Sequence, residues 1–185
     1  MSTSVNHLDE RTRDSSDLLE EIMPSAITLA MMLRQRKMAA WLRTEFDGYQ
    51  DVAAAPPYRR GLHGHIVAKS PQKGNGNRVL LEKDEMAVLQ KQINLTAELA
   101  INLSRDAYCR LLRTVRAAIY LWTQDLMAEG IAGEHNHYSP DERAKVAHLD
   151  EPEKFWRRAM EEVDNLPIPD VREVGFFERV FGRAG

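Results

Sequence analysis

The sequence predicts a mainly α-helical fold, a bundle of about five or six helices with a small β-hairpin insertion. Three observations lead to this prediction. Apolar residues recur at helical spacing over most of the chain. Glycine and capping residues stand where that spacing stops. One stretch, residues 51–82, loses the helical period and is rich in proline, glycine and β-prone residues.

The longest expected helix ends at Glu129, and Ser104 is its candidate cap. One face of it carries Val115, Ile119, Trp122 and Leu126. Gly130 follows, as expected of a residue that leaves a helix with positive φ, and Ile131 stands where a side chain packs back on the last turn.

The next helix has three concurring start signals. Ser139 is a side-chain N-cap, Pro140 takes the first helical position, and Glu142 stands three residues after the cap. A shaped loop, residues 130–138, therefore joins two well-defined helix ends. Apolar Val146 and Leu149 belong to the second helix, and Pro152 ends it.

The N-terminal part is expected to contain a flexible tail over residues 1–15, because its charges are mixed and its apolar residues few. A helix then begins near Ser16 or Asp17, with Asp17 and Glu20 in capping-box register. Pro24 either kinks this helix or marks its first turn, and the unbroken periodicity favours a kink or a short leading turn. A further helix, residues 38–47, stops at Gly48.

The insertion is expected to be a two-stranded hairpin within residues 60–82. Residues 63–68 and 78–82 are β-prone, and the intervening residues 69–77 are dense in turn formers. The helical period returns at Asp84 and is expected to continue through Ile101. Lys69, Lys73 and Arg78 give this tip a phosphate-loop composition without P-loop spacing, so a hairpin tip is the favoured interpretation.

The overall composition argues against several classes of protein. The 185 residues are 43% hydrophobic and 29% charged, with a net charge of −3, so no overall attraction to nucleic acid or anionic membrane is expected. No apolar run reaches the length of a membrane span, and the N-terminus lacks a signal-peptide core. The single cysteine, Cys109, excludes an internal disulfide. We therefore expect a cytoplasmic protein with no cofactor.

Two sequence blocks resemble the AbiTii domain of bacterial abortive-infection and anti-phage proteins. The first block spans residues 41–49 and 57–59, and the second spans residues 115–142. The resemblance implies a helical domain over residues 16–150 with a small β insertion, and a role against phage. It supplies no catalytic mechanism. The residues that carry it are Trp41, Glu45, Gly48, Tyr49, Tyr58, Arg59, Arg116, Trp122, Glu129, Gly130 and Gly133.

The sharpest chemical candidate is the loop of Glu134, His135 and His137. Two histidines two residues apart on an extended segment point the same way and can chelate a metal, with His63 and His65 as further ligands if the hairpin lies near. The spacing matches no established metal motif. Solvent-facing or locally bonded histidines are therefore the favoured interpretation, and no metal is expected.

The charged residues around the second block also have structural explanations. Asp141 and Glu142 suit the positive end of a helix. Arg116, Asp125 and Glu129 can pair along their helix or reach Arg59 or Arg43 of the first block. A buried Arg–carboxylate contact joining the two blocks is the favoured hypothesis, and binding of an anionic ligand is the alternative.

The last residues, 151–185, form an amphipathic appendix outside the region of resemblance. Its aromatic residues either cover the domain's own core or form a docking patch, and we take the patch as the working hypothesis. The candidate patch consists of Phe155, Trp156, Phe176, Phe177 and Phe181. Self-association or peripheral membrane binding through this segment are further alternatives.

The function predicted from these features is a non-enzymatic interaction or regulatory module of an anti-phage defence system, acting with a partner protein or a phage protein. The alternative is a small metal-dependent nuclease or toxin that uses His135 and His137.

Overall fold

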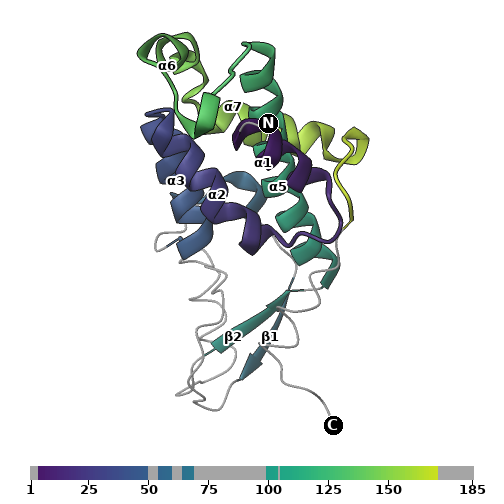
Figure 1. Cartoon of the computed structure of the whole chain (residues 1–185). Coiled ribbons are helices and arrows are strands. Elements are labelled where there is room, and N and C mark those ends of the chain that lie inside the picture. The colour runs from purple at the N-terminus through teal and green to yellow at the C-terminus, as the bar shows by residue number, and fades with distance from the viewer. Residues whose placement is uncertain (1–3, 50–53, 60–63, 69–98, 104, 171–185) are drawn as a thin grey trace. The chain divides into compact units, whose positions relative to one another are not determined.

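The computed structural model describes residues 4–49, 54–59, 64–68, 99–103 and 105–170. The chain divides into two compact units, one of residues 1–47 and 112–171, the other of residues 48–111 and 172–185. Six α-helices lie in the described residues, which confirms the mainly helical prediction (Figure 1). They are α1 (Ser4–Arg13), α2 (Leu19–Met32), α3 (Arg36–Asp47), α5 (Arg105–Ala128), α6 (Pro140–Lys145) and α7 (Pro152–Glu162).

The first unit is built around α2, which packs on α1 and on α3, while α3 also contacts α7. Its core consists of side chains that recur at helical spacing and are almost completely buried, as the periodicity predicts. The largest are Leu8, Ile22, Leu29, Leu33, Met38, Leu42, Ile119, Trp122, Leu126, Leu149 and Phe155.

Helix α1 corrects the expectation of a flexible tail over residues 1–15. Val5 and Leu8 are buried on one side of α1, and so is the carboxylate-bearing Asp9. Asp9 accepts hydrogen bonds from Thr123 Oγ1 at 2.9 Å and from Gln124 Nε2 at 2.7 Å. The composition of α1 misleads because its docking depends on polar partners on α5, far away in the sequence.

The start of α2 lies one residue beyond the predicted cap. Leu18 is the N-cap, and its main-chain N–H donates to the Glu21 carboxylate at 3.3 Å, so the Asp17–Glu20 register is wrong. Pro24 lies inside the helix. Because helix geometry continues on both sides of it, Pro24 does not mark the first turn, and that alternative is excluded.

The second unit contains the strands β1 (Gly64–Ala68) and β2 (Leu99–Leu103), which pair antiparallel with Ile66 opposite Ile101. The predicted hairpin is not seen: β1 pairs with a segment that was expected to be helical, and residues 78–82 lie outside the described residues. Leu99, Ile101 and Leu103 alternate with Ala100 and Asn102, a two-residue period that a short apolar run does not separate from a helical one.

Short 3₁₀ turns connect or follow the helices. They are η2 (Pro57–Arg59), η3 (Glu134–Asn136), η4 (Ala147–Leu149) and η5 (Val163–Asn165). Pro152 stands at the first turn of α7, where its missing N–H costs nothing. The segment expected as an appendix, residues 151–185, thus begins with a helix of the first unit.

Candidate functional site

The loop between α5 and α6, residues 130–139, is the shaped feature that the sequence singles out. Gly130 has φ +69° and its N–H donates to the Met127 carbonyl at 2.9 Å, so α5 ends as predicted. Ile131 is buried behind it. Gly133, His135 and Asn136 also have positive φ, which makes the loop a run of left-handed residues.

The carboxylate of Glu142 fixes this loop. One oxygen accepts from the N–H groups of Ala132 at 3.1 Å and Gly133 at 2.9 Å. The other accepts from the N–H of Ser139 at 2.8 Å, and the Ser139 hydroxyl accepts from the N–H of Glu142 at 3.2 Å. This confirms the predicted capping box and extends it into the preceding loop.

Hydrogen bonds from the main-chain N–H groups of Gly133 and then Ser139 lower the pKa of Glu142 below its ordinary value. The folded state therefore binds this proton less readily than the unfolded chain. The resulting stabilisation is fully present above the unfolded pKa and is lost as the pH falls through the lower folded value.

We expect Glu142→Gln to lower the free energy of unfolding at neutral pH by about 1–2 kcal/mol, because the amide replaces one acceptor by a donor facing the Ser139 N–H. The difference from wild type should shrink as the pH is lowered below the ordinary glutamate range. Urea unfolding at a series of pH values measures both effects. Asp141→Asn, in the same turn but exposed, is the matched control. A pH-independent difference would contradict the assigned role.

The Tyr138 ring packs against Gly133 of the same loop. Its side chain is 1% exposed, and a Cβ built on Gly133 would lie 2.5 Å from its Cε1 atom. Burial raises the pKa of the Tyr138 phenol, against a smaller opposing effect of Ser4. Gly133 is therefore required twice, for its positive φ and for the closeness of the ring.

The candidate ligands Glu134, His135 and His137 all lie exposed on or beside η3. Asn136 between them accepts a hydrogen bond from the Ser4 hydroxyl. Among the residues that the structure describes, no three His, Cys, Asp or Glu side chains are grouped so that they could hold a metal ion. His63 lies outside the described residues, and so does the side chain of His65.

Arg116, from the middle of α5, is 2% exposed and donates to main-chain carbonyls at the end of α1 and in the α1–α2 connection. Its Nε donates to Thr12 at 2.7 Å, its Nη1 to Asp17 at 2.7 Å, and its Nη2 to Arg11 at 2.9 Å and to Asp14. The segment that it holds precedes the first block, residues 41–49 and 57–59. These carbonyl contacts give Arg116 a structural role that the hypothesis of an Arg–carboxylate contact between the blocks did not foresee.

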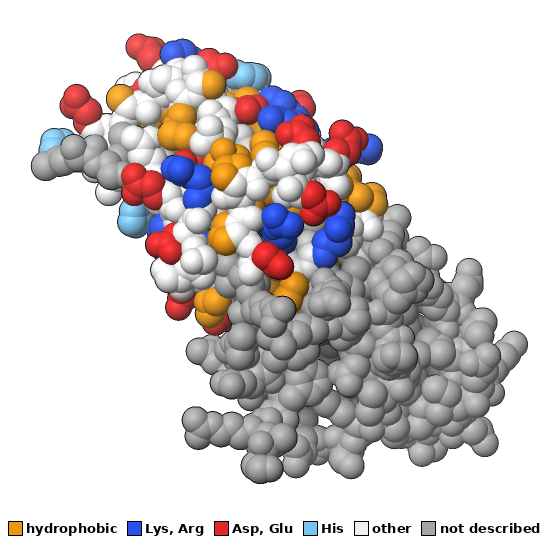
Figure 2. Space-filling model, turned by 90° about the vertical axis from the view of Figure 1, so that its right-hand side faces the viewer, with side chains coloured by type: hydrophobic (Ala, Val, Ile, Leu, Met, Phe, Trp, Pro, Cys, Tyr) orange, Lys and Arg blue, Asp and Glu red, His pale blue; other side chains and the backbone are white. Residues whose placement is uncertain are grey.

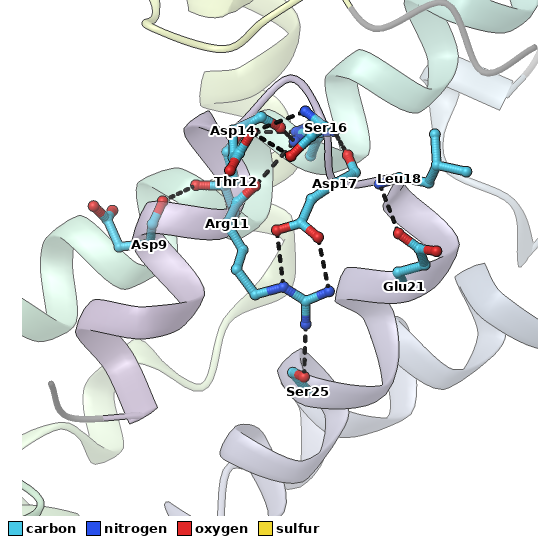
Figure 3. Close-up of polar contacts among 10 residues, drawn as sticks. Asp9, Arg11, Thr12, Asp14, Ser16, Asp17, Leu18, Glu21 and Ser25 are labelled. Carbon is cyan, nitrogen blue, oxygen red and sulfur yellow. Dashed lines mark hydrogen bonds and ion pairs between the residues drawn. The ribbon is translucent and has the colours of Figure 1, made fainter.

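Side-chain hydrogen bonds also stabilise the α1–α2 connection (Figure 3). Arg11 pairs with both oxygens of Asp17, at 3.0 and 3.2 Å, and donates to Ser25 on α2 at 3.1 Å. Asp14 accepts from the N–H of Ser16 at 2.8 Å, which lowers the pKa of this carboxyl. The connection is therefore a shaped, hydrogen-bonded loop with Arg116 behind it.

Two other residues of the second block also make structural contacts. The indole of Trp122 is buried and donates to Gln35 Oε1 at 2.8 Å, while Gln35 Nε2 donates to the Val146 carbonyl at 2.8 Å. Gln35 is 1% exposed, and no pattern in the sequence marked it as a buried polar residue. Glu129 lies 3.5 Å from His148.

Asp125, considered as a partner for arginines of the first block, is paired with α7. It accepts from Lys154 at 2.9 Å and from Arg158 at 3.2 Å. These contacts join α5 to the helix that begins the expected appendix.

In the first block, Trp41 and Glu45 are buried on α3, and Gly48 has φ +101°, as predicted for the end of that helix. Within the second unit, the Arg59 guanidinium lies 5.1 Å from the centroid of the Tyr49 ring, and Tyr58 is buried.

The aromatic patch is corrected where the structure describes it. Phe155 is fully buried and Trp156 is 8% exposed, so both belong to the core and not to a docking surface. Phe176, Phe177 and Phe181 lie outside the described residues. Figure 2 shows one face of the molecule, on which basic and acidic side chains are interspersed with hydrophobic ones.

Comparison with known proteins gives one match. The model of the AbiTii family matches residues 5–91, a range that contains the first block and starts in α1, whereas the second block lies beyond its end. No curated protein and no solved structure matches the chain. No helix in the described residues is long and apolar enough to cross a membrane. The AbiTii resemblance indicated by the sequence is therefore confirmed over residues 5–91.

Proposed function

We propose that this chain is a non-enzymatic interaction or regulatory module of a bacterial abortive-infection system. The family match, whose name denotes that kind of defence, supports the defence part of the proposal. The module acts with a partner protein of the same system or with a phage protein that triggers it. Its domain extends through the second block, since α5 and α6 complete the unit to which α2 and α3 belong.

One observation carries the non-enzymatic part: the carboxylates of Glu129 and Glu142, on either side of the shaped loop, both have partners within the chain. Glu142 accepts from three main-chain N–H groups, and Glu129 lies beside His148. A general base must be within reach of a substrate proton, and a carboxylate that already accepts several main-chain hydrogen bonds is a poor base. The charged residues of the second block are therefore better explained by a role in folding than by a role in catalysis.

The proposal predicts how phage plating depends on the neighbouring genes. Cells expressing the chain alone should plate phage at the level of empty cells, and cells carrying the native neighbouring genes as well should resist. Resistance should survive the double change His135→Ala with His137→Ala, because both side chains are exposed and outside the contacts that fix the loop. Efficiency of plating measures this, with immunoblots to equalise expression.

Arg157→Ala, an exposed change on α7, is the matched surface control. Protection by the lone chain that disappears in the double histidine variant would overturn the proposal and favour the metal-dependent effector. Failure to protect with or without the neighbouring genes would contradict the defence role itself.

A further inference from the structure

The turn between α2 and α3 carries exposed positive charge. Residues 22–44 contain no aspartate or glutamate, although the whole chain has 28 acidic residues and a net charge of −3. The same residues contain four cationic side chains, all of them exposed, which we call the basic corner: Arg34, Arg36, Lys37 and Arg43. The local charge of this surface is thus opposite in sign to that of the chain as a whole.

The four side chains gather around the end of α2 and the start of α3. Arg36 and Arg43 stand on one side of α3, about two helical turns apart, with Ala40 exposed between them. Arg43 Nη2 donates to Met31 Sδ at 3.5 Å, so this guanidinium lies beside the last turn of α2, which Arg34 follows. A single partner segment can therefore contact cations from both sides of the turn.

None of the cations of the basic corner forms an ion pair among the residues that the structure describes. Cations on α7, in the same unit, are paired. Lys154 and Arg158 lie 2.9 and 3.2 Å from carboxylate oxygens of Asp125, and Arg157 pairs with Glu153. The contrast indicates that the charge of the basic corner is not used to stabilise the first unit.

The backbone at Arg34 favours a different residue. Arg34 has φ +58° and ends α2 in a Schellman motif, in which its N–H donates to the Met31 carbonyl at 3.0 Å and the N–H of Gln35 donates to the Ala30 carbonyl at 2.9 Å. Glycine usually takes this position, because a residue with a Cβ is strained there. A long cationic side chain is therefore kept at a cost in free energy, which points to a role outside the fold.

The first turn of α3 is also an unfavourable place for cations. The helix dipole favours acidic side chains there, and α3 has none, whereas Arg36 and Lys37 both stand in this turn. The carboxylate that stabilises the helix start belongs to Asp150, which accepts from the main-chain N–H groups of Lys37 at 3.2 Å and Met38 at 2.8 Å. Local stability thus accounts for Asp150 but not for the side chains of Arg36 and Lys37.

We propose that the basic corner binds an acidic segment of the protein with which this module acts. This inference rests on the proposed function, because it names the chemistry of that partner. The charge pattern favours a protein over a nucleic acid: Asp47 is exposed one turn after Arg43, and the Asp150 carboxylate lies at the start of α3. A phosphate backbone is negative throughout and is repelled by both carboxylates, whereas a protein segment can place its own carboxylates opposite the cations alone.

Fluorescence anisotropy of a labelled poly-L-glutamate peptide, titrated with the purified full chain at low salt, tests the charge preference. Wild type should bind this peptide more tightly than a labelled oligothymidine of equal charge, and added salt should weaken the binding. Arg36→Gln with Arg43→Gln should raise the peptide dissociation constant by about fivefold or more. Arg157→Glu, on α7, produces the same net charge and is the matched control, with an unchanged constant.

Arg34→Gly separates binding from folding. It should weaken peptide binding by about two- to threefold, because one cation is lost. It should at the same time raise the melting temperature by about 1–3 °C, because glycine relieves the strain at positive φ. A fall in the melting temperature would show that the side chain serves the fold, and would contradict the proposal.

Phage plating with the native neighbouring genes tests the same surface in cells. Arg36→Gln with Arg43→Gln should abolish resistance, and Arg157→Glu should keep it. Resistance that survives the double change overturns this inference and leaves the proposed function standing, whereas a wild type that gives no resistance contradicts the proposed function. In the binding assay, the inference is overturned by a wild type that does not bind poly-L-glutamate, by binding indifferent to the double change, or by tighter binding of oligothymidine.

Discussion

Arg116→Ala is expected to lower the free energy of unfolding by about 3–4 kcal/mol. The guanidinium donates to the carbonyls of Arg11, Thr12, Asp14 and Asp17. Two of these, Arg11 and Thr12, belong to the last turn of α1, where main-chain donors are few; the Arg11 carbonyl also accepts from the N–H of Asp14 at 3.3 Å. Removing the side chain leaves carbonyls without their charged donor and opens a cavity beneath the α1–α2 connection. Urea unfolding of the purified chain measures the loss.

Two control variants distinguish the carbonyl contacts of Arg116 from a general effect of its charge. Arg116→Lys keeps the charge but has one ammonium group, which cannot reach carbonyls spread from residue 11 to residue 17, so it should recover only part of the loss. Arg157→Ala, on an exposed pair with Glu153, should change stability by less than about 0.5 kcal/mol.

Hydrogen exchange should show where the loss acts. Amides of α1 are expected to exchange much faster in Arg116→Ala, while those of α3 follow the global change in stability. Equal acceleration throughout both helices, or a stability loss no larger than that of Arg157→Ala, would show that the carbonyl contacts do not hold α1 in place.

The features that could be predicted from the sequence are those fixed by neighbouring residues. Gly48 and Gly130 end their helices with positive φ, and the Ser139–Glu142 pair begins α6. Each of these helix ends depends on backbone geometry within one helical turn, so the identities of a few neighbouring residues are enough to predict it. The buried faces of α2, α3 and α5 follow for a related reason, since periodicity is also local.

The features that could not be predicted depend on distant partners. The sequence of α1 resembles a flexible tail because the helix docks through distant partners, with Asp9 bonded to Thr123 and Thr12 to Arg116. These pairs are more than a hundred residues apart in the sequence. The pairing of β1 with β2 is hidden in the same way, because register is set by a partner strand and not by the strand itself.

In the candidate site, too, local features could be predicted and contacts with more distant residues could not. His135 and His137 are conspicuous in the sequence because histidine is a common metal ligand and acid–base group. In the structure both side chains are exposed. The residue that organises the loop is Glu142, which was expected only to cap α6. Its reach back to Ala132 and Gly133 requires the loop to fold over the start of the helix, which capping rules do not describe.

The second large effect is expected at Gly133, whose substitution by alanine should cost about 2–4 kcal/mol of stability. Its φ of +53° is strained for any residue with a Cβ. The new methyl group would in addition lie 2.5 Å from Tyr138 Cε1 and 2.8 Å from Cζ, and the ring is too buried to move freely. Thermal or urea unfolding gives the loss directly.

Gly130→Ala provides the comparison that isolates the steric part. Gly130 also has positive φ, at +69°, but a Cβ there would meet only the end of the Lys145 side chain, at 3.6 Å. It should therefore show the backbone strain alone, about 1 kcal/mol. The excess in Gly133→Ala should fall when Tyr138 is replaced by leucine, because the two changes then share a partner and cease to be additive. Equal losses at the two glycines would mean that the Tyr138 ring yields at little cost and that the loop is less rigidly supported than its contacts imply. A clear excess that Tyr138→Leu relieves would show that ring packing, together with the Glu142 carboxylate, gives the 130–139 loop its shape.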